Sequence, residues 1–145
     1  MFTTALMNRN GTPACQALLR CVESGEIVGI LAPVVLGELS YMLTSRPLTP
    51  QGQEPRTARQ VAPYLLGLLG WVGIEMGDKQ LACAALEAWR DGQADSFVDC
   101  YLQARAAAAG EPVCADNARH FPESVHPAEL VGLARPGKPP PARGQ

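Results

Sequence analysis

Short apolar runs alternate with helical patterns along this chain, and this alternation restricts its possible folds more than any other feature. The run at residues 26–32 is apolar, rich in β-branched residues and bounded by Gly25 and Pro33, which is typical of a buried strand. Two further runs, at 72–76 and 112–115, predict brief strands. Strands separated by helices predict right-handed βαβ units, and therefore an α/β fold with a mostly parallel sheet covered on both faces.

Five segments between and around these runs have the spacing or the boundary residues of helices. Pro13 suits a first helical turn, Gly25 a C-cap, Asp78 an N-cap, and Gly110 a helix end. The polar loop at 47–55 is expected to be exposed. The predicted helices span 13–24, 34–45, 57–69, the segment between Asp78 and Gly92, and 95–109.

Composition limits the class of protein. A chain of 145 residues is the length of one domain, and we expect that domain at 1–133, followed by a disordered Pro-rich tail at 134–145. The net charge of −2 provides no global positive field to attract nucleic acid, although an enzyme that holds phosphate through a metal remains possible. The five cysteines include no CxxC pair, and no apolar run approaches about 18 residues. We therefore expect reduced thiols, a cytoplasmic location and no contact with a membrane.

Four acidic residues stand in positions where a carboxylate has a function more often than elsewhere. Glu38 lies among apolar residues one turn into a predicted helix, so we expect it to face the core unless a partner or a metal holds it. Asp95 and Asp99 are four residues apart at a helix start and would repel each other without a cation between them. Asp116 directly follows a predicted strand, where the sites of α/β proteins form.

Each of these acids also has a purely structural interpretation. Glu38 could pair with an arginine at a helix edge, Asp95 could be an N-cap, and Asp116 could form an Asx-turn. If Glu38, Asp99 and Asp116 converge, they form a hard oxygen site suited to Mg²⁺ or Mn²⁺, which could activate water for attack on a phosphodiester.

These acids, in this order and context, resemble those of the PIN-domain ribonucleases, especially the VapC-like toxins of bacterial toxin–antitoxin pairs. Residues 24–41 are similar to the family's strand and following helix, with its glutamate at Glu38. The segment Asp95-Ser-Phe-Val-Asp99 is similar to the family's D-F-x-D helix start, with one extra residue between the acids. Val113-Cys-Ala-Asp116 is similar to its V-T-x-D segment, with Cys114 in place of the usual Thr or Ser.

The resemblance implies a three-layer α/β/α fold and a Mg²⁺-dependent endoribonuclease that acts as the toxin of a toxin–antitoxin pair. It implies Glu38, Asp99 and Asp116 as catalytic metal ligands, with Asp95 as an auxiliary metal ligand. It also implies an RNA substrate, a small antitoxin as protein partner, and a homodimer.

The N-terminal part departs from the family pattern. The family begins with a strand that ends in an Asp-x-Asn motif, whereas no Asp or Glu precedes Glu23 here, and residues 2–10 resemble the helix that follows that strand. Either the true start lies upstream or the chain is a degenerate relative. Loss of a central strand would leave backbone N–H and C=O groups of the two neighbouring strands without hydrogen-bond partners. We therefore expect a repaired sheet, a swapped or dimeric arrangement, or a marginal fold, and weak activity.

Two other hypotheses therefore accompany the nuclease. One is a catalytically degenerate PIN-like module that binds a protein partner. The other is an unrelated small α/β domain in which the acids are caps and turns. In such an unrelated domain, the side chains of Glu38, Asp99 and Asp116 would lie far apart.

Overall fold

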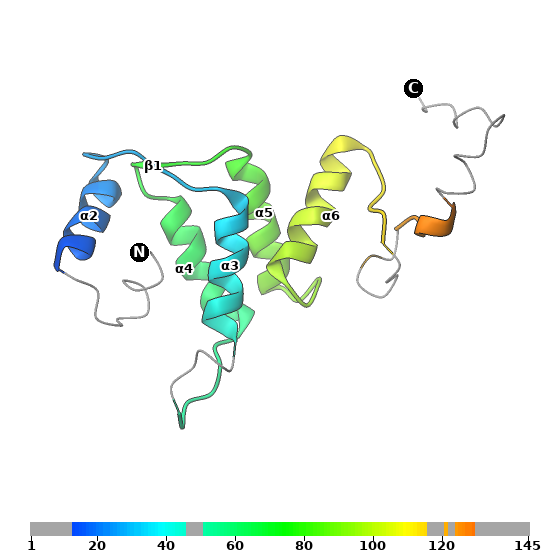
Figure 1. Ribbon diagram of the computed structural model, residues 1–145, viewed down its shortest axis with the longest axis horizontal. Helices are drawn as coiled ribbons and strands as arrows, with labels where there is room; N and C mark the ends of the chain where they lie inside the picture. Colours follow the sequence, from blue (N-terminus) through cyan, green and yellow to red (C-terminus); the bar gives the residue numbers. More distant parts are fainter. Residues whose placement is uncertain (1–12, 46–50, 116–120, 122–123, 130–145) are drawn as a thin grey trace. The chain divides into compact units, whose positions relative to one another are not determined.

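A computed structural model of the 145-residue chain describes residues 13–45, 51–115, 121 and 124–129 (Figure 1). The chain forms two compact units, residues 1–101 and 102–145. The predicted tail at 134–145 and the family-like helix at 2–10 lie outside the described residues. The observed class is α/β, with helices and a parallel pair of strands.

The first helix of the described residues is α2 (Pro13–Ser24), which has the predicted bounds. Gly25 ends this helix with φ +82°, a conformation that glycine adopts without strain. Beyond the turn, the backbone N–H of Gly73 donates to the carbonyl of Val22 at 2.9 Å, and the N–H of Gly29 donates to the carbonyl of Gly73 at 2.7 Å. Gly73 therefore joins the end of α2 to the start of the sheet.

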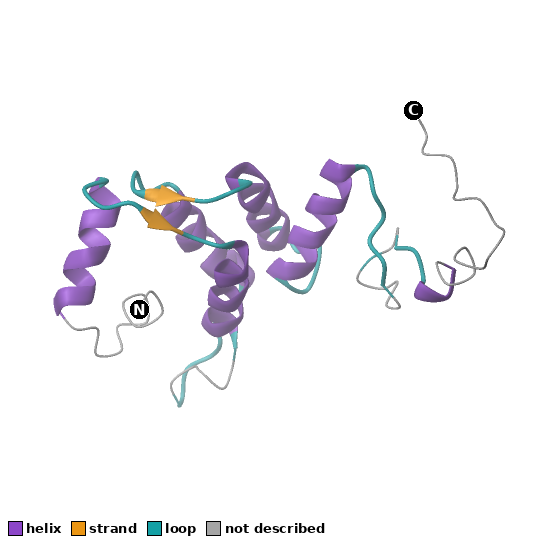
Figure 2. Cartoon of the chain, turned by 45° about the horizontal axis from the view of Figure 1, so that its top comes forward, coloured by secondary structure: helices purple, strands orange, loops and turns teal. Residues whose placement is uncertain are grey.

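The sheet of the described residues consists of β1 (Gly29–Ile30) and β2 (Ile74–Glu75), which pair in parallel (Figure 2). In the register, Gly29 lies opposite Ile74 and Ile30 opposite Glu75. Ile74 is buried whereas Ile30 is 84% exposed. Ile74 belongs to the hydrophobic core cluster, together with buried side chains of the helices.

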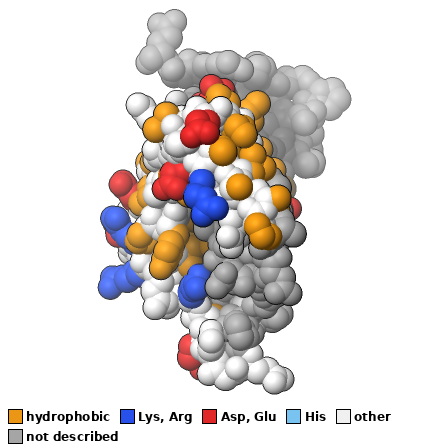
Figure 3. Space-filling model, turned by 90° about the vertical axis from the view of Figure 1, so that its left-hand side faces the viewer, with side chains coloured by type: hydrophobic (Ala, Val, Ile, Leu, Met, Phe, Trp, Pro, Cys, Tyr) orange, Lys and Arg blue, Asp and Glu red, His pale blue; other side chains and the backbone are white. Residues whose placement is uncertain are grey.

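The prediction of a buried strand over 26–32 is therefore wrong in two respects. The ladder is shorter than the apolar run, because β1 has only β2 as a neighbour among the described residues. Ile27, Val28 and Ile30 are also substantially exposed, although Leu31 is buried. Apolar character indicated a strand but did not show which of its side chains would be covered. Figure 3 shows hydrophobic side chains at the surface beside acidic and basic ones.

Helices α3 (Pro33–Thr44), α4 (Ala58–Leu69) and α5 (Lys79–Arg90) form the body of the first unit, with α4 in contact with both of the others (Figure 1). All three lie within two residues of the predicted bounds. Their buried side chains recur at helical spacing, so each helix turns one apolar face to a common core. The largest fully buried side chains of this unit are Leu36, Leu39, Val61, Leu65, Leu69, Leu86 and Phe97.

The helix starts show how local sequence sets these bounds. The side-chain oxygen of Gln60 accepts a hydrogen bond of 2.9 Å from the backbone N–H of Thr57, as in a capping box. Asp78 occupies the predicted N-cap position of α5, but its backbone is left-handed, with φ 56°. Aspartate tolerates this region better than most residues do.

Helix α6 (Phe97–Ala109) begins in the first unit and ends in the second. Gly110, with φ +66°, ends it as predicted: its N–H donates to Ala107 and that of Glu111 donates to Ala106, which is the Schellman pattern. The predicted strand at 112–115 is only a single parallel bridge between Cys114 and Val125. No helix of the described residues is long and apolar enough to cross a membrane.

Candidate functional site

Glu38 lies on the solvent side of α3, not in the core. The helix buries Leu36, Leu39 and Leu43, which recur at steps of three and four residues, and Glu38 falls between these positions. Its side chain is exposed. The expectation that it would face the core is therefore wrong, because its apolar neighbours in sequence belong to a different face of the helix.

The face of α3 that carries Glu38 is otherwise apolar or aromatic. Val34, Glu38 and Tyr41 are spaced by four and three residues, so they lie on one side of the helix. Val34 and Tyr41 are each 68% exposed. Two large side chains that could have packed inward instead border the carboxylate at the surface.

The start of α6 places the second acidic residue. Ser96 precedes the helix, and its hydroxyl oxygen accepts a hydrogen bond of 3.1 Å from the backbone N–H of Asp99. Ser96 is therefore the side-chain cap, a role the sequence had suggested for Asp95. Asp99 lies in the first turn, where a carboxylate is favoured by the helix dipole.

Asp95 lies outside α6, two residues before its first residue. The expectation that Asp95 and Asp99 share a helical face is therefore wrong, because the helix starts later than the sequence suggested. Asp95 is exposed and Asp99 is half-buried. Asp95 takes part in interactions of its own, as does Asp99.

Helix α3 and the first turn of α6 meet at Gly37 and Val98. A Cβ atom placed on Gly37 would lie 3.0 Å from Cγ2 of Val98, which is tighter than ordinary van der Waals contact. Glu38 follows Gly37 directly, and Asp99 follows Val98 directly. Each of these acids is therefore one residue away from the contact between the two helices.

A groove of about 550 Å³ opens at this contact. Its only ionisable groups are the Glu38 carboxyl and the two tyrosine hydroxyls, and none of its described lining residues is basic. Its volume is within the range of small-molecule sites. The residues that line it are Pro33, Val34, Gly37, Glu38, Tyr41, Phe97, Val98 and Tyr101.

Packed aromatic rings support the α6 side of this groove. Phe97 is 1% exposed, and its ring lies edge-on to Trp89, with the centroids 6.5 Å apart and the planes at 71°. The ring of Tyr101 is tilted by 41° against Phe97, at 5.9 Å. Such contacts fix ring orientation, so this wall is anchored in the core.

The third predicted ligand, Asp116, lies outside the described residues. Among the residues that are described, no three Asp, Glu, His or Cys side chains are grouped closely enough to hold a metal together. The described part of the site therefore offers Glu38 and Asp99 on adjoining helix segments. The convergence of all three acids stays a prediction.

The two cysteines nearest the core of the first unit, Cys100 and Cys83, are poorly suited to act as nucleophiles. Burial raises the pKa of the Cys100 thiol, and the charge of Asp99 raises it further, against a backbone hydrogen bond from Ala94 that lowers it. The pKa of Cys83 is also raised, mainly by burial and then by Glu87. Both sulfurs are therefore protonated at neutral pH and are poor nucleophiles.

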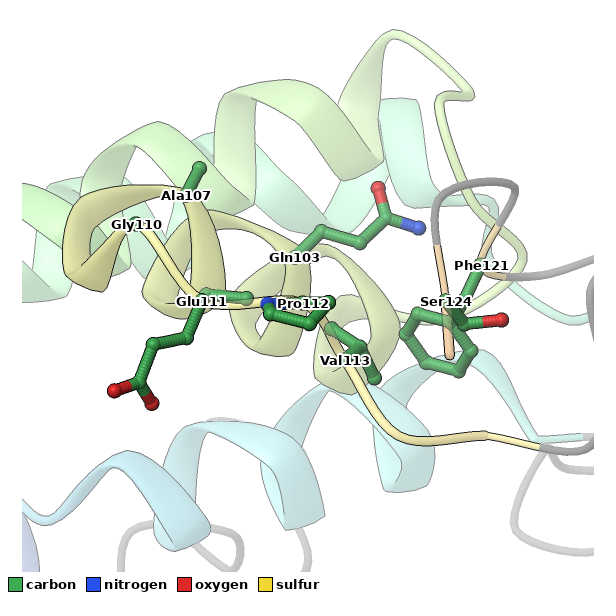
Figure 4. A pocket seen from close by; sticks show the side chains of 9 residues that line it. Gln103, Ala107, Gly110, Glu111, Pro112, Val113, Phe121 and Ser124 are labelled. Atoms are coloured by element: carbon green, nitrogen blue, oxygen red, sulfur yellow. The ribbon is translucent and has the colours of Figure 1, made fainter. Parts of the chain in front are cut away.

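The second unit has a cavity of its own, of about 620 Å³, near the C-terminal end of α6 (Figure 4). Gln103, Val113, Phe121 and Ser124 are among the residues that line it. The carboxylate of Glu111 points away from Phe121 and Ser124 (Figure 4). Glu111 is the only acidic residue among the described residues that line this cavity, whereas the groove at Glu38 lies beside the helix turn that carries Asp99, so that groove is the stronger candidate.

The two tyrosines of the groove, Tyr41 and Tyr101, were not predicted from the sequence. Tyr41 stands three residues after Glu38, and Tyr101 stands two residues after Asp99. The helical spacing of Val34, Glu38 and Tyr41 was a usable signal, because it places three residues on the face opposite the leucines. No pattern in the sequence indicated that α3 and α6 lie close to each other.

Comparisons of the chain with models of protein families, with curated proteins and with solved structures gave no match. The assignment of a function consequently depends on the groove and on the pattern of acidic residues.

Proposed function

We propose that this chain is a PIN-like, Mg²⁺-dependent endoribonuclease of the toxin type. Glu38, Asp99 and Asp116 would hold the ion, which could also be Mn²⁺, and Asp95 would be the auxiliary acid. The contact of Gly37 with Val98 carries the proposal, because it brings the helix segments of Glu38 and Asp99 to one groove. The three-layer α/β/α arrangement and the domain at 1–133 belong to the same proposal.

The one carboxylate that lines the groove, Glu38, is a donor that suits a small hard cation. Mg²⁺ prefers oxygen ligands and is commonly held by one or two carboxylates, with water and substrate phosphate completing its shell. Glu38 is exposed, so its carboxylate can reach an ion without losing an internal partner in the core. None of the described residues that line the groove is a lysine or an arginine, so no basic side chain of the lining competes with a cation for the Glu38 carboxylate.

Each residue has a defined part in such a reaction. When bound, Mg²⁺ supplies an activated water and offsets the charge of a phosphodiester. The carboxylates of Glu38 and Asp99 would hold the ion from two helices, and the bond from Asp99 N–H to Ser96 fixes the first turn of α6. Val34 and Val98 form apolar parts of the wall of this groove.

Cleavage of a fluorescent single-stranded RNA tests this proposal. We expect cleavage with Mg²⁺ or Mn²⁺ and none with EDTA. Glu38→Gln and Asp116→Asn should each lower the rate on the order of 100-fold, because a lost ligand removes several kcal/mol of charge stabilisation. Glu87→Gln, which changes an exposed carboxylate on α5 away from the groove, is the matched control.

Equal activity in Asp116→Asn and in the unchanged chain would point to a contaminating nuclease and would remove the support for catalysis. The same preparation should therefore be assayed for all variants. The proposal includes a small antitoxin as protein partner and a homodimer, because the resemblance to the PIN-domain toxins implies both.

A second candidate function is a PIN-like module that binds a protein without turnover. The exposed side chains of Val34, Tyr41 and Val98 favour it, because large apolar groups gathered at a surface often mark a protein interface. It predicts that no divalent ion supports cleavage while the fold remains intact. Metal-dependent cleavage that requires Glu38 would exclude it as the complete account.

A further inference from the structure

We infer that the outer edge of β1 pairs with the same edge of a second copy of this chain, so that the two-stranded sheets of both copies join into one. The inference goes beyond the proposed nuclease, because it depends on the backbone of the sheet and needs neither a metal nor RNA. It gives self-association a defined surface and a defined register.

The backbone of β1 is paired on one side only among the described residues (Figure 2). The N–H groups of Gly29 and Leu31 donate to backbone carbonyls of the neighbouring strand segment, at 2.7 and 2.9 Å. Successive N–H groups along a strand point to opposite sides, so those of Val28 and Ile30 point away from β2. These groups form an edge on which a further strand can add.

The outer edge of β2, by contrast, is covered by its own chain. Ile74 lies between the two residues whose carbonyls bond to the β1 segment, so its own backbone groups face the opposite side. Its carbonyl accepts a hydrogen bond of 3.0 Å from the ammonium of Lys79, and its N–H donates to the carbonyl of Trp71 at 3.1 Å. A lysine at a sheet edge opposes pairing with another strand. One edge of the sheet is therefore protected, whereas the β1 edge is not.

The side chains at the β1 edge are apolar. Val28 is 58% exposed and Ile30 is 84% exposed. Residues 27–31 include no charged residue and no proline, the two kinds of residue with which natural proteins commonly prevent pairing at an exposed edge. Nothing in this segment therefore repels another apolar strand.

A second copy matches this edge in both shape and charge. Two identical edges related by a twofold axis run antiparallel, and an axis at Gly29 places Val28 of one copy opposite Ile30 of the other. Each of these pairs combines two exposed β-branched side chains, which stabilise a sheet when they lie opposite each other. Glu26 would lie opposite Ala32 of the other copy, so no like charges meet along the ladder.

Sedimentation velocity over a range of protein concentrations tests the inference on the full chain. We expect a dimer whose fraction rises with concentration, and association weakened by about 10- to 100-fold in Ile30→Pro, because each copy loses one outward N–H donor. Ile30→Val keeps this donor and a β-branched side chain, so its association should stay within about threefold of that of the unchanged chain. Tyr64→Ala is the control for loss of an exposed side chain elsewhere, because Tyr64 is 63% exposed on α4.

Disulfide trapping tests the register without a proline. Val28→Cys and Ile30→Cys are made in separate chains that also carry Cys114→Ser, because Cys114 is the exposed cysteine of the chain. The Cα atoms of a hydrogen-bonded antiparallel pair lie about 5.5 Å apart, within reach of a disulfide. After oxidation with diamide, a mixture of the two variants should form a linked dimer. Either variant alone should form little, because two copies of the same position are not opposite each other.

Efficient linkage in either cysteine variant alone, or a dimer that persists in folded Ile30→Pro, would place association at another surface and overturn the inference. An unchanged chain that stays monomeric would also overturn it and would leave the edge to a different protein or to a segment outside the described residues. Unfolding midpoints of all variants separate an association defect from a folding defect. None of these outcomes alters the RNA cleavage expected to depend on Glu38, so the inference and the proposed nuclease fail in different experiments.

Discussion

Among the glycines of the described residues, Gly73 leaves the least room for a side chain. A Cβ atom at this position would overlap the carbonyl oxygens of Val22 and Ile27, which are backbone atoms and cannot move aside cheaply. We predict that Gly73→Ala lowers the free energy of unfolding by about 2 kcal/mol or more.

Gly67 provides the matched control for this substitution. It lies inside α4, and a Cβ atom there would meet nothing within 4 Å. Gly67→Ala should therefore raise the free energy of unfolding by about 0.5–1 kcal/mol, through helix propensity. Urea denaturation of the two variants gives the comparison, and similar midpoints for both would contradict the close packing at Gly73.

Cys100 gives a second prediction at this scale. Because burial raises the pKa of its thiol, the folded chain favours the neutral form, whereas the unfolded chain ionises at the ordinary thiol pKa of about 8.5. The free energy of unfolding should therefore be unaffected by this group at lower pH and fall as the pH rises above that value.

Alkylation with iodoacetamide, followed by mass spectrometry, tests the burial of this thiol. Cys114 is exposed and should react in the folded chain at pH 8, whereas Cys100 is 2% exposed and should react only on unfolding. Equally fast modification of both cysteines would show that the start of α6 is open to solvent.

Among the elements, α6 connects stability to the candidate site. Ser96 caps this helix through the N–H of Asp99, so Ser96→Ala should cost about 1 kcal/mol. Under the proposed function it should also slow cleavage, because Asp99 loses the bond that fixes its backbone. Ser96→Asp keeps a capping oxygen and should recover stability in thermal unfolding. A Ser96→Ala chain as stable as the unchanged one would contradict the cap.

The helices could be predicted from the sequence more closely than the strands. Helix hydrogen bonds are local, so Pro13 and Gly25 bound α2 as predicted, and α3 and α4 were displaced by only a residue. Strand length depends on partners distant in sequence. Only two residues of the predicted strand at 26–32 are therefore paired in β1, and the predicted strand at 112–115 contributes a single bridge.

At the scale of the whole described chain, apolar side chains in and beside the sheet are exposed. Val28, Ile30 and Val72 are 58%, 84% and 79% exposed, and β1 has one neighbour among the described residues. Edge strands of this kind favour pairing with another chain, which agrees with the proposed homodimer.

Ile30→Lys tests association through this surface. A lysine on an exposed edge strand opposes pairing, while the loss of an exposed isoleucine costs the monomer little. We predict a concentration-dependent dimer of the unchanged chain in sedimentation velocity, a monomer for Ile30→Lys, and no change for Tyr64→Ala. A dimer that persists in Ile30→Lys would assign association to another surface.

The assembly of the site is the part that the sequence could not supply. The sequence context indicated Glu38 and Asp99 as candidates. The exposure of Glu38, however, depends on which face of α3 carries the buried leucines. The meeting of the two helices at Gly37 and Val98 depends on tertiary packing, which leaves no trace in local spacing. The assignment of Asp116 as a ligand depends on its sequence motif alone.

Mn²⁺ binding followed by electron paramagnetic resonance tests directly whether Glu38, Asp99 and Asp116 jointly hold one divalent ion, as we propose. We predict one bound Mn²⁺ per chain, with affinity lowered at least about 10-fold by each of Glu38→Gln, Asp99→Asn and Asp116→Asn. Glu87→Gln should bind as the unchanged chain does. Undiminished binding in all three acid variants, or no Mn²⁺ binding by the folded chain, would contradict a shared metal site at these three acids.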